Sequence, residues 1–107
     1  MSARYEIFLG TDSQYYFRLR AANSEIILQS EGYSTRQGAV NGVQSVRTHS
    51  PYDRYYSRLL SRDNKYYFTL SAANNQIIGT SQRYTTSTAR DVGIDSVKRN
   101  GPTAPIV

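Results

Sequence analysis

His49 is the only histidine in the sequence, and it is the one side chain whose type alone suggests acid–base chemistry near neutral pH. It follows a predicted helix, where a histidine supplies a favourable charge at the helix C-terminus, so we expect no catalytic role for it. The chain contains no cysteine, which excludes disulfides and thiolate metal sites.

The eight acidic residues are scattered singly along the chain. They are Glu6, Asp12, Glu25, Glu31, Asp53, Asp63, Asp91 and Asp95. Asp91 and Asp95 are four residues apart on one predicted helix face, but a metal site needs further ligands, and two solvated carboxylates explain the spacing. The sequence also has no serine-nucleophile motif, no GxGxxG and no phosphate-binding loop. It therefore predicts no bound cofactor and a protein that is not an enzyme.

Tyrosine and arginine are the residues with the greatest binding potential. The chain has ten tyrosines, and its thirteen Lys and Arg residues exceed eight Asp and Glu residues for a net charge of +5. Only Lys65 and Lys98 among these cations are lysines. Arginine binds phosphate bidentately and stacks on flat rings, so this bias favours an anionic partner, although a need for solubility also accounts for it.

Residues 15–21 alternate as a half-buried strand does. One face carries Tyr15, Phe17, Leu19 and Ala21, and the opposite, outward face carries Tyr16, Arg18 and Arg20. A strand at 66–72 places Tyr67, Thr69 and Ser71 outward, and the strands before these two contribute Arg4 and Tyr55. The predicted binding face consists of Tyr16, Arg18, Arg20, Tyr67, Arg4 and Tyr55.

Three interpretations of this face remain open. Aromatic rings between arginines can stack bases and neutralise phosphates, as in single-strand nucleic-acid binders. The same face, or a free sheet edge, can dock a protein, including another copy of the chain. Finally, antiparallel sheets often leave one face in water, and Tyr–Arg pairs stabilise such a face without any ligand. We rank a non-enzymatic binding or protein-interaction module first, with single-stranded nucleic-acid binding as the alternative, and expect binding to centre on the more basic first half.

An internal repeat organises the chain. Residues 15–23, Tyr-Tyr-Phe-Arg-Leu-Arg-Ala-Ala-Asn, return 51 residues later as Tyr-Tyr-Phe-Thr-Leu-Ser-Ala-Ala-Asn, and the offset continues without a gap. Matched pairs further along include Ile26 and Ile77, Tyr33 and Tyr84, Gly42 and Gly93, and Pro51 and Pro102. An ungapped match of this length indicates the duplication of one structural unit.

Each copy predicts three strands, at 4–9, 15–21 and 26–30 in the first and at 55–60, 66–72 and 77–81 in the second. Turn residues separate them. They are Gly-Thr-Asp-Ser and Ser-Arg-Asp-Asn after the first strands, and Ala-Asn-Ser and Ala-Asn-Asn after the second. Asparagine tolerates the left-handed conformation that a tight hairpin needs, so both second turns are expected to be short.

A helix follows the third strand in each copy. Ser34 and Gln37 have the spacing of a capping box, and Ala39, Val43 and Val46 then share one helical face. The second copy repeats this face with Ala89, Gly93, Ile94 and Val97.

Glycine recurs inside both predicted helices, at Gly42 and Gly93. Glycine costs about 1 kcal/mol relative to alanine in a helix interior, so its repetition indicates a close approach of helix to sheet. Pro51 and Pro102 end the units after their helices.

Together the copies predict an α+β fold with two tandem β-β-β-α-β repeats, one continuous antiparallel sheet and two helices on one face. Three strands and one helix bury little surface alone, so the units should join edge to edge. The tails at 52–54 and 103–107 are expected to supply the final strands. We expect one domain over 1–107, made of repeats at about 4–54 and 55–107.

Three motifs occur in both halves: Tyr-Phe-x-Leu-x-Ala-Ala-Asn, Ile-Ile-x-x-Ser followed by a tyrosine, and Gly-[Val/Ile]-x-Ser-Val. Through them the sequence resembles the YegP-like family of small prokaryotic tandem-repeat proteins over nearly its whole length. The resemblance implies a final strand per repeat, exchanged between repeats within one sheet, and it brings no catalytic residue set. Val92 departs from the usual Asn, and Ser24 and Asn75 depart from the usual turn glycine.

No apolar run reaches the length of a signal peptide or the ~20 residues of a membrane span. With the absence of cysteine, this leads us to expect a cytoplasmic protein without a membrane partner.

Overall fold

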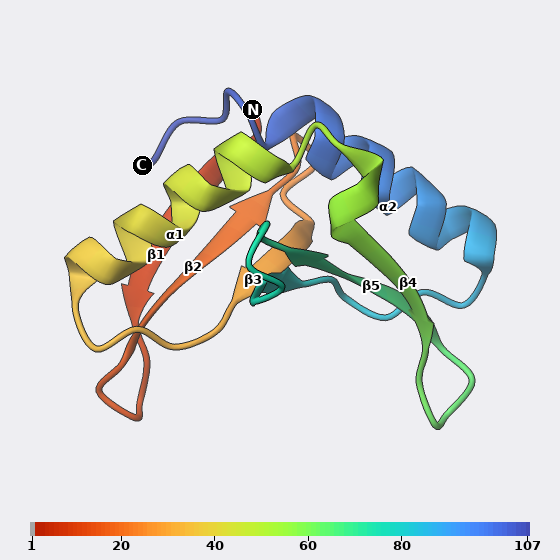
Figure 1. The fold of residues 1–107 in the computed structure, drawn as a ribbon, viewed down its shortest axis with the longest axis horizontal. Helices are drawn as coiled ribbons and strands as arrows, with labels where there is room; N and C mark the ends of the chain where they lie inside the picture. Colours follow the sequence, from red (N-terminus) through yellow and green to blue (C-terminus); the bar gives the residue numbers. More distant parts are fainter. Residues whose placement is uncertain (1) are drawn as a thin grey trace.

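A computed structural model describes residues 2–107, in which six strands form one antiparallel sheet and two helices lie over one of its faces (Figure 1). The first repeat supplies β1 (Arg4–Leu9), β2 (Tyr15–Arg20), β3 (Ile26–Ser30) and α1 (Arg36–His49). The second supplies β4 (Tyr56–Leu60), β5 (Tyr66–Ser71), β6 (Ile77–Thr80) and α2 (Ser87–Asn100). A short 3-10 turn, η1 (Asp53–Tyr55), joins them. The α+β class and the tandem repeat are thus confirmed.

The two halves meet at the centre of the sheet. The strand order is β1-β2-β3-β6-β5-β4, so β3 and β6 form the seam, with Gln29 opposite Thr80 and Ser30 opposite Gly79. Gly79 is the repeat counterpart of Leu28, and a Cβ on it would lie 2.7 Å from the Leu28 side chain. One half therefore contributes a large side chain at the seam because the other contributes none.

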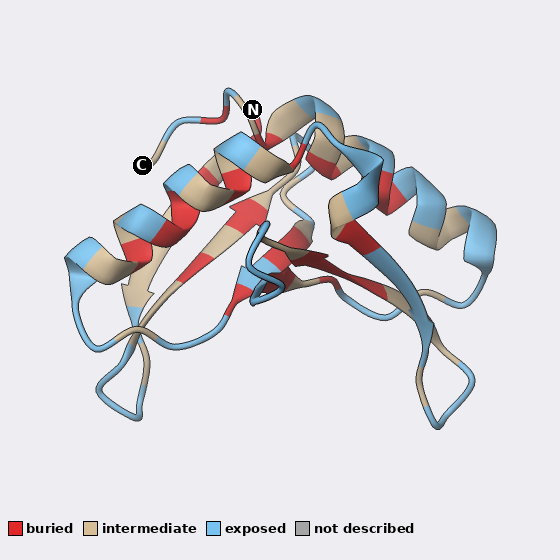
Figure 2. Ribbon diagram, viewed as in Figure 1, coloured by how far each residue is buried: buried red, intermediate tan, exposed pale blue. Residues whose placement is uncertain are grey.

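The core lies between the sheet and the helices, where Figure 2 shows the buried residues on facing surfaces. The fully buried side chains alternate along the strands and recur every three or four residues along the helices. The largest are Tyr5, Phe17, Phe68, Leu19, Leu28, Leu70, Ile94, Val43, Val46 and Val97. The predicted inward faces of β2 and of both helices are confirmed by this set.

Both helices begin with a threonine cap rather than the expected capping box. Thr35 has extended backbone angles, and its hydroxyl accepts a hydrogen bond from the Gly38 amide at 3.0 Å. Thr86 accepts one from the Ala89 amide at the same distance in the second repeat. The expectation that Ser34 caps the first helix was therefore wrong by one residue, because the extended cap conformation falls on Thr35.

The close helix approach predicted at the glycines involves aromatic side chains. A Cβ on Gly42 would collide with the Tyr33 hydroxyl and would lie 2.7 Å from the Phe17 ring. Gly93 has the same relation to the Tyr84 hydroxyl. In each repeat the glycine makes room for the tyrosine that follows the third strand.

The second hairpin turn of each repeat contains a residue with positive φ, as expected, but one position later than Asn23. The residues are Ser24, with φ 70°, and Asn75, with φ 69°. Asn23 instead accepts a hydrogen bond from the Glu25 amide at 3.0 Å through its side-chain oxygen, which stabilises the turn.

The expected final strands are only partly present. The tail of the second repeat pairs with β1 at one residue. The Tyr5 amide donates to the Pro105 carbonyl at 2.8 Å and the Val107 amide donates to the Tyr5 carbonyl at 2.9 Å. These two bonds form a single parallel bridge between Tyr5 and Ile106. In the first repeat the expectation was wrong. Its tail runs directly into β4, so it cannot pair beside that strand and forms η1 instead.

Candidate functional site

β1 and β2 bring their polar side chains together on the outer face, which we define as the sheet face turned away from the helices. Strand alternation points the even-numbered residues of both strands outward, and antiparallel register sets them opposite one another. The outward pairs are Arg4 with Arg20, Glu6 with Arg18, and Phe8 with Tyr16.

Glu6 is at the centre of an arginine cluster, defined here as Arg4, Arg18 and Arg20 with Glu6. The Nε atoms of Arg18 and Arg20 each donate to Oε1 of Glu6 at 2.7 Å. Arg4 Nε lies 3.8 Å from Oε2. The hydrogen bonds from Arg20 and Arg18 hold the pKa of the Glu6 carboxyl below its ordinary value.

The β2–β3 turn fixes two of these arginines. Arg20 donates from Nη1 to the Ser24 carbonyl at 2.7 Å, and Arg4 donates from Nη2 to the Ser24 hydroxyl at 3.2 Å. Arg18 is the most exposed of the three, with 31% of its side chain accessible against 23% for Arg20 and 15% for Arg4. Three guanidinium groups around one carboxylate leave the cluster with excess positive charge.

An aromatic pair extends the arginine cluster toward the β1–β2 hairpin. The rings of Phe8 and Tyr16 stack with centroids 5.8 Å apart, and the Arg18 guanidinium lies 4.5 Å from the Phe8 centroid. The Tyr16 hydroxyl donates to Asp12, and this hydrogen bond lowers the pKa of the Asp12 carboxyl. The ring of Tyr16 thus belongs to the outer face while its hydroxyl is bound within the hairpin.

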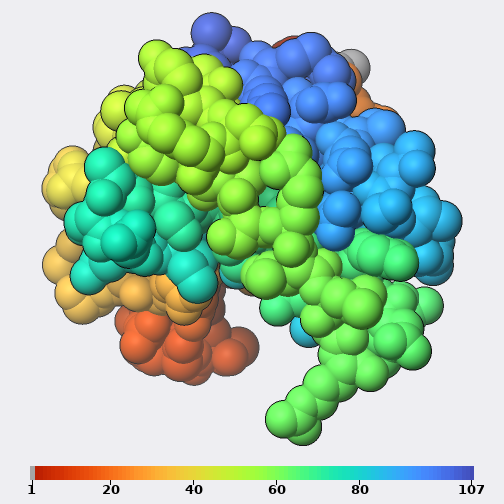
Figure 3. Space-filling view, turned by 45° about the vertical axis from the view of Figure 1, so that its right-hand side comes forward, coloured from red at the N-terminus to blue at the C-terminus, as the bar shows by residue number. Residues whose placement is uncertain are grey.

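Tyr67, the fourth predicted face residue, lies far from the arginine cluster. β2 and β5 lie on opposite sides of the seam. Tyr16 follows the β1–β2 hairpin tip, whereas Tyr67 follows the β4–β5 hairpin tip. Figure 3 shows these tips, coloured red and green, on either side of a notch. Tyr67 instead has Arg83 over its ring, at 5.3 Å from the centroid.

Tyr55 does not extend a strand of the outer face, so its predicted place there was wrong. It ends η1 rather than starting β4, and its ring packs edge-on against His49 at the end of α1, with centroids 4.7 Å apart. The reason is that the first-repeat tail turns before β4, as described above.

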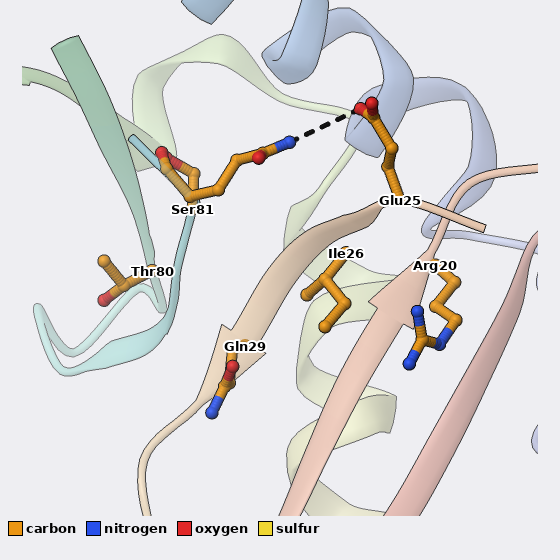
Figure 4. Close-up of a pocket in the computed structure, with 7 residues that line it drawn as sticks. Arg20, Glu25, Ile26, Gln29, Thr80 and Ser81 are labelled. Atoms are coloured by element: carbon orange, nitrogen blue, oxygen red, sulfur yellow. Dashed lines mark hydrogen bonds between the residues drawn. The ribbon is translucent and has the colours of Figure 1, made fainter. Parts of the chain in front are cut away.

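A hollow of about 410 Å³ opens at the seam beside the arginine cluster. Figure 4 shows Arg20, Ile26 and Gln29 on one side and Thr80 and Ser81 on the other. The Gln82 amide donates to Glu25 across it at 3.5 Å. The outer face therefore combines excess positive charge, an aromatic pair and a concave centre.

His49 has a structural role that differs from the expected end charge. Its Nδ1 lies 2.8 Å from the Ser45 carbonyl, and its Nε2 accepts a hydrogen bond from the Ala73 amide at 3.1 Å. This arrangement requires a neutral ring with the proton on Nδ1. His49 thereby ties the end of α1 to the β5–β6 turn of the other repeat.

Residues 2–107 contain no group of three or more His, Cys, Asp or Glu side chains that could hold a metal ion. Within the same range, neither helix combines the length and the apolar character needed to cross a membrane.

Two residues of the outer face were missed in the sequence. Glu6 and Phe8 were not included, although the alternation of residues 4–9 places them on the same side as Arg4. Extending the strand pattern of residues 15–21 to the preceding strand would have found both.

The fold and this face define a class: tandem-repeat α+β proteins with one helix-covered sheet face and one open, arginine-bearing face. Both repeats match the family described as Domain of unknown function (DUF1508), over residues 11–56 and 61–107. The chain belongs to this family, as the resemblance found in the sequence implied.

Relatives match over almost the whole chain. A UPF0339 protein of Shewanella oneidensis is 48% identical over 99% of this chain and 96% of its own length. The UPF0339 protein YegP of Escherichia coli K12 is 45% identical over 94% and 92%.

Two solution NMR structures share the fold. UPF0339 protein SO3888 from Shewanella oneidensis superimposes with a TM-score of 0.91 at 48% identity, covering 99% of this chain and 90% of that one. The protein of unknown function yegP from E. coli gives 0.92 at 42% identity, covering 99% and 91%.

Proposed function

We propose that this protein is a non-enzymatic protein-interaction module whose outer face binds an acidic segment of a partner. The observation that carries the proposal is the arginine cluster, in which three guanidinium groups surround the single carboxylate of Glu6 beside the Phe8–Tyr16 pair. Arginine and aromatic residues are enriched in protein interfaces and in their energetic hot spots.

The charge balance of the outer face favours a protein over a nucleic acid. The Nε atoms of Arg18 and Arg20 are already bound to Glu6, so part of the positive charge of the arginine cluster is neutralised and attracts a polyanion less. The outer face also continues across the seam hollow to β4 and β5, where the outward side chains of Leu59 and Tyr67 are uncharged. A mixed charged and apolar face suits a folded or extended polypeptide better than a polyanion.

The absence of enzymatic activity is part of this proposal. Two buried tyrosine hydroxyls make structural hydrogen bonds. Tyr5 donates to the Gly101 carbonyl and Tyr56 donates to the Ser50 carbonyl, each at 2.7 Å. Burial raises the pKa of both hydroxyls well above the ordinary tyrosine value. Both nitrogens of His49 are also engaged. A chain without cysteine suits a reducing compartment, so we propose the cytoplasm as the site of action.

Single-stranded nucleic acid is the second candidate, because excess positive charge next to stacked rings is also what a single-strand binder uses. Binding of that kind weakens steeply with salt, since each neutralised phosphate releases counterions. A short acidic peptide on a mixed face depends less on salt.

The test is a titration of the isotope-labelled protein, followed by amide chemical shifts, with an acidic peptide and separately with oligo-dT and oligo-U, at about 50 mM and about 300 mM salt. The proposal predicts shifts on β1, β2 and the seam with the peptide, retained in part at the higher salt. Arg18→Ala/Arg20→Ala should reduce peptide affinity about tenfold or more, as expected when charged hot-spot residues are truncated.

Arg36→Ala/Arg62→Ala is the matched control, because it removes the same charge from residues that make no ion pair with any other residue in 2–107. If both double variants lost the same peptide affinity, the loss would be due to net charge alone, which would contradict the proposal. Tight oligonucleotide binding that disappears at the higher salt would favour the second candidate. Self-association mapped to the outer face would make the partner another copy.

A further inference from the structure

A groove of about 490 Å³ lies on the helix side of the molecule, between the β2–β3 turn and α2. It shares only Glu25 with the lining of the seam hollow on the outer face, and its volume falls within the usual range of small-ligand sites. Three small residues on successive turns of α2, Ala89, Gly93 and Ser96, line it. Ala21 and Ala22 line it from the turn.

The repeat provides a comparison, because at the equivalent place beside α1 a side chain binds the turn. There His49 extends from the end of α1, and its Nε2 accepts the Ala73 amide hydrogen at 3.1 Å. The counterpart of His49 beside α2 is Asn100, whose side chain donates to Ser96 at 3.2 Å instead. The counterpart of Ala73 is Ala22, and its amide has no hydrogen-bond partner among residues 2–107.

A second donor lines the same groove. Arg99 on α2 makes no ion pair or hydrogen bond with any other described residue, and its counterpart on α1 is the uncharged Thr48. The groove therefore presents an unpaired amide and an unpaired guanidinium, which together suit a carboxylate. Glu25 also lines the groove, so a bound carboxylate must stay toward Arg99.

Part of the remaining lining is apolar, and at one position the α1 side is polar instead. Val92 is 61% exposed, and its counterpart on α1 is Asn41. Ile27 and Ala89 complete this surface. An apolar ligand group that covers the exposed valine side chain removes apolar surface from water, which favours binding.

We propose that this groove binds a small carboxylic acid with a branched apolar chain. The carboxylate accepts hydrogen bonds from the Ala22 amide, in place of the imidazole nitrogen found in the other half, and from the Arg99 guanidinium. The branched chain packs against Val92, Ala89 and Ile27. This site does not depend on the outer face, so either proposal can fail without the other.

The test uses 4-methylpentanoate as the probe and amide shifts of the full-length protein as the readout. A Kd on the order of 1 mM is expected for a ligand of this size. Shifts should concentrate at Ala22, Val92 and Ser96. The neutral 4-methylpentanamide should bind at least fivefold more weakly, and Arg99→Gln, which alters an exposed side chain, should weaken the acid by a similar factor.

Asn100→His is the decisive variant, because it supplies the imidazole that binds the turn in the other half. It should abolish binding of the acid, and it should change the chemical shift of the Ala22 amide even without ligand. His49→Asn is its matched control and should leave acid binding unchanged.

The proposal would be overturned by equal binding of acid and amide, by unchanged acid binding in Arg99→Gln, or by no shifts in the groove at concentrations well above the expected Kd. Tenfold tighter binding of N-acetyl-alanyl-leucine than of the free acid would identify a peptide C-terminus as the occupant and would also overturn it. The Arg18→Ala variant should bind the acid as the wild type does, because Arg18 makes its hydrogen bond to Glu6 and not to the β2–β3 turn.

Discussion

Gly42 shows how a single missing methyl group positions an aromatic ring. A Cβ there would meet the Tyr33 hydroxyl first and the Phe17 ring at 2.7 Å, whereas at Gly93 the corresponding Phe68 ring is 3.3 Å away. Neither helix can come as close to the sheet with alanine at this position unless the tyrosine moves.

Gly42→Ala should therefore destabilise the protein by about 1–3 kcal/mol through overpacking, despite the better helix propensity of alanine. Gly93→Ala should cost less, because its second contact is looser. Urea unfolding measures both. Asn41→Ala, at an exposed neighbouring position, is the control and should change stability by less than about 0.5 kcal/mol.

Adding Tyr33→Phe to Gly42→Ala removes the hydroxyl that is closest to the new methyl group. The double variant should recover part of the lost stability. A Gly42→Ala variant as stable as the wild type, or no recovery in the double variant, would show that the hydroxyl is not what the glycine accommodates.

Leu28 and Gly79 show how residue differences break the symmetry of the repeat. They occupy equivalent positions at the seam, and the glycine leaves the space that the leucine fills. Two leucines would collide there and two glycines would leave a void, so the halves are complementary rather than interchangeable.

At the scale of elements, η1 stands where the first repeat lacks a final strand, and ion pairs of Asp53 hold it to its neighbours. Asp53 Oδ1 lies 2.8 Å from Arg58 of β4 and 2.8 Å from Lys98 of α2. Hydrogen bonds from Arg58 and then Lys98 depress the pKa of the Asp53 carboxyl far below its ordinary range. One carboxylate thus connects the linker, an edge strand and a helix.

This link predicts an acid-dependent contribution to stability. Because the folded-state pKa of Asp53 is depressed, the contribution is present above the ordinary aspartate pKa of about 4 and is lost as pH falls below it. Asp53→Asn should lower Tm at neutral pH, and its difference from the wild type should shrink in acid. Thermal melts between about pH 7 and about pH 2 measure this.

Asp95→Asn is the control for that measurement, since Asp95 is exposed and makes no ion pair within residues 2–107. Its Tm should follow the wild type at every pH. If the Tm difference of Asp53→Asn stays constant across the range, ionisation of Asp53 does not contribute as described.

For the whole molecule, the two repeats depend on each other for their cores. α1 contacts β5 and β6 of the other half, α2 contacts β3, and His49 binds the turn between β5 and β6. The C-terminal tail returns to β1, so the chain ends are also joined through the first strand.

We therefore expect the chain to fold as one domain and its halves to fail alone. Residues 2–54 should be unfolded by circular dichroism, because a dimer of this half would place two copies of Leu28 at the seam. Mixing residues 2–54 with 55–107 should restore secondary structure. A folded, monomeric 2–54 fragment would contradict this expectation.

Local patterns were sufficient to predict the elements. Strand alternation and the 51-residue offset indicated all six strands and both helices, and the repeated glycines indicated where the helices approach the sheet closely. The outward direction of Tyr16, Arg18 and Arg20 followed from the same alternation. These features depend on residues near one another in the chain, so the sequence alone could determine them.

Contacts between distant residues were decided only by the tertiary structure. The position of Tyr55 depends on the connection between the repeats, and the separation of Tyr67 from the arginine cluster depends on which strands form the seam. The groove beside α2 differs from the equivalent place beside α1 because Asn100 binds Ser96 of its own helix, whereas His49 binds the turn of the other half. Equivalent sequence positions became different sites because covalent connection and seam packing cannot be the same for both copies.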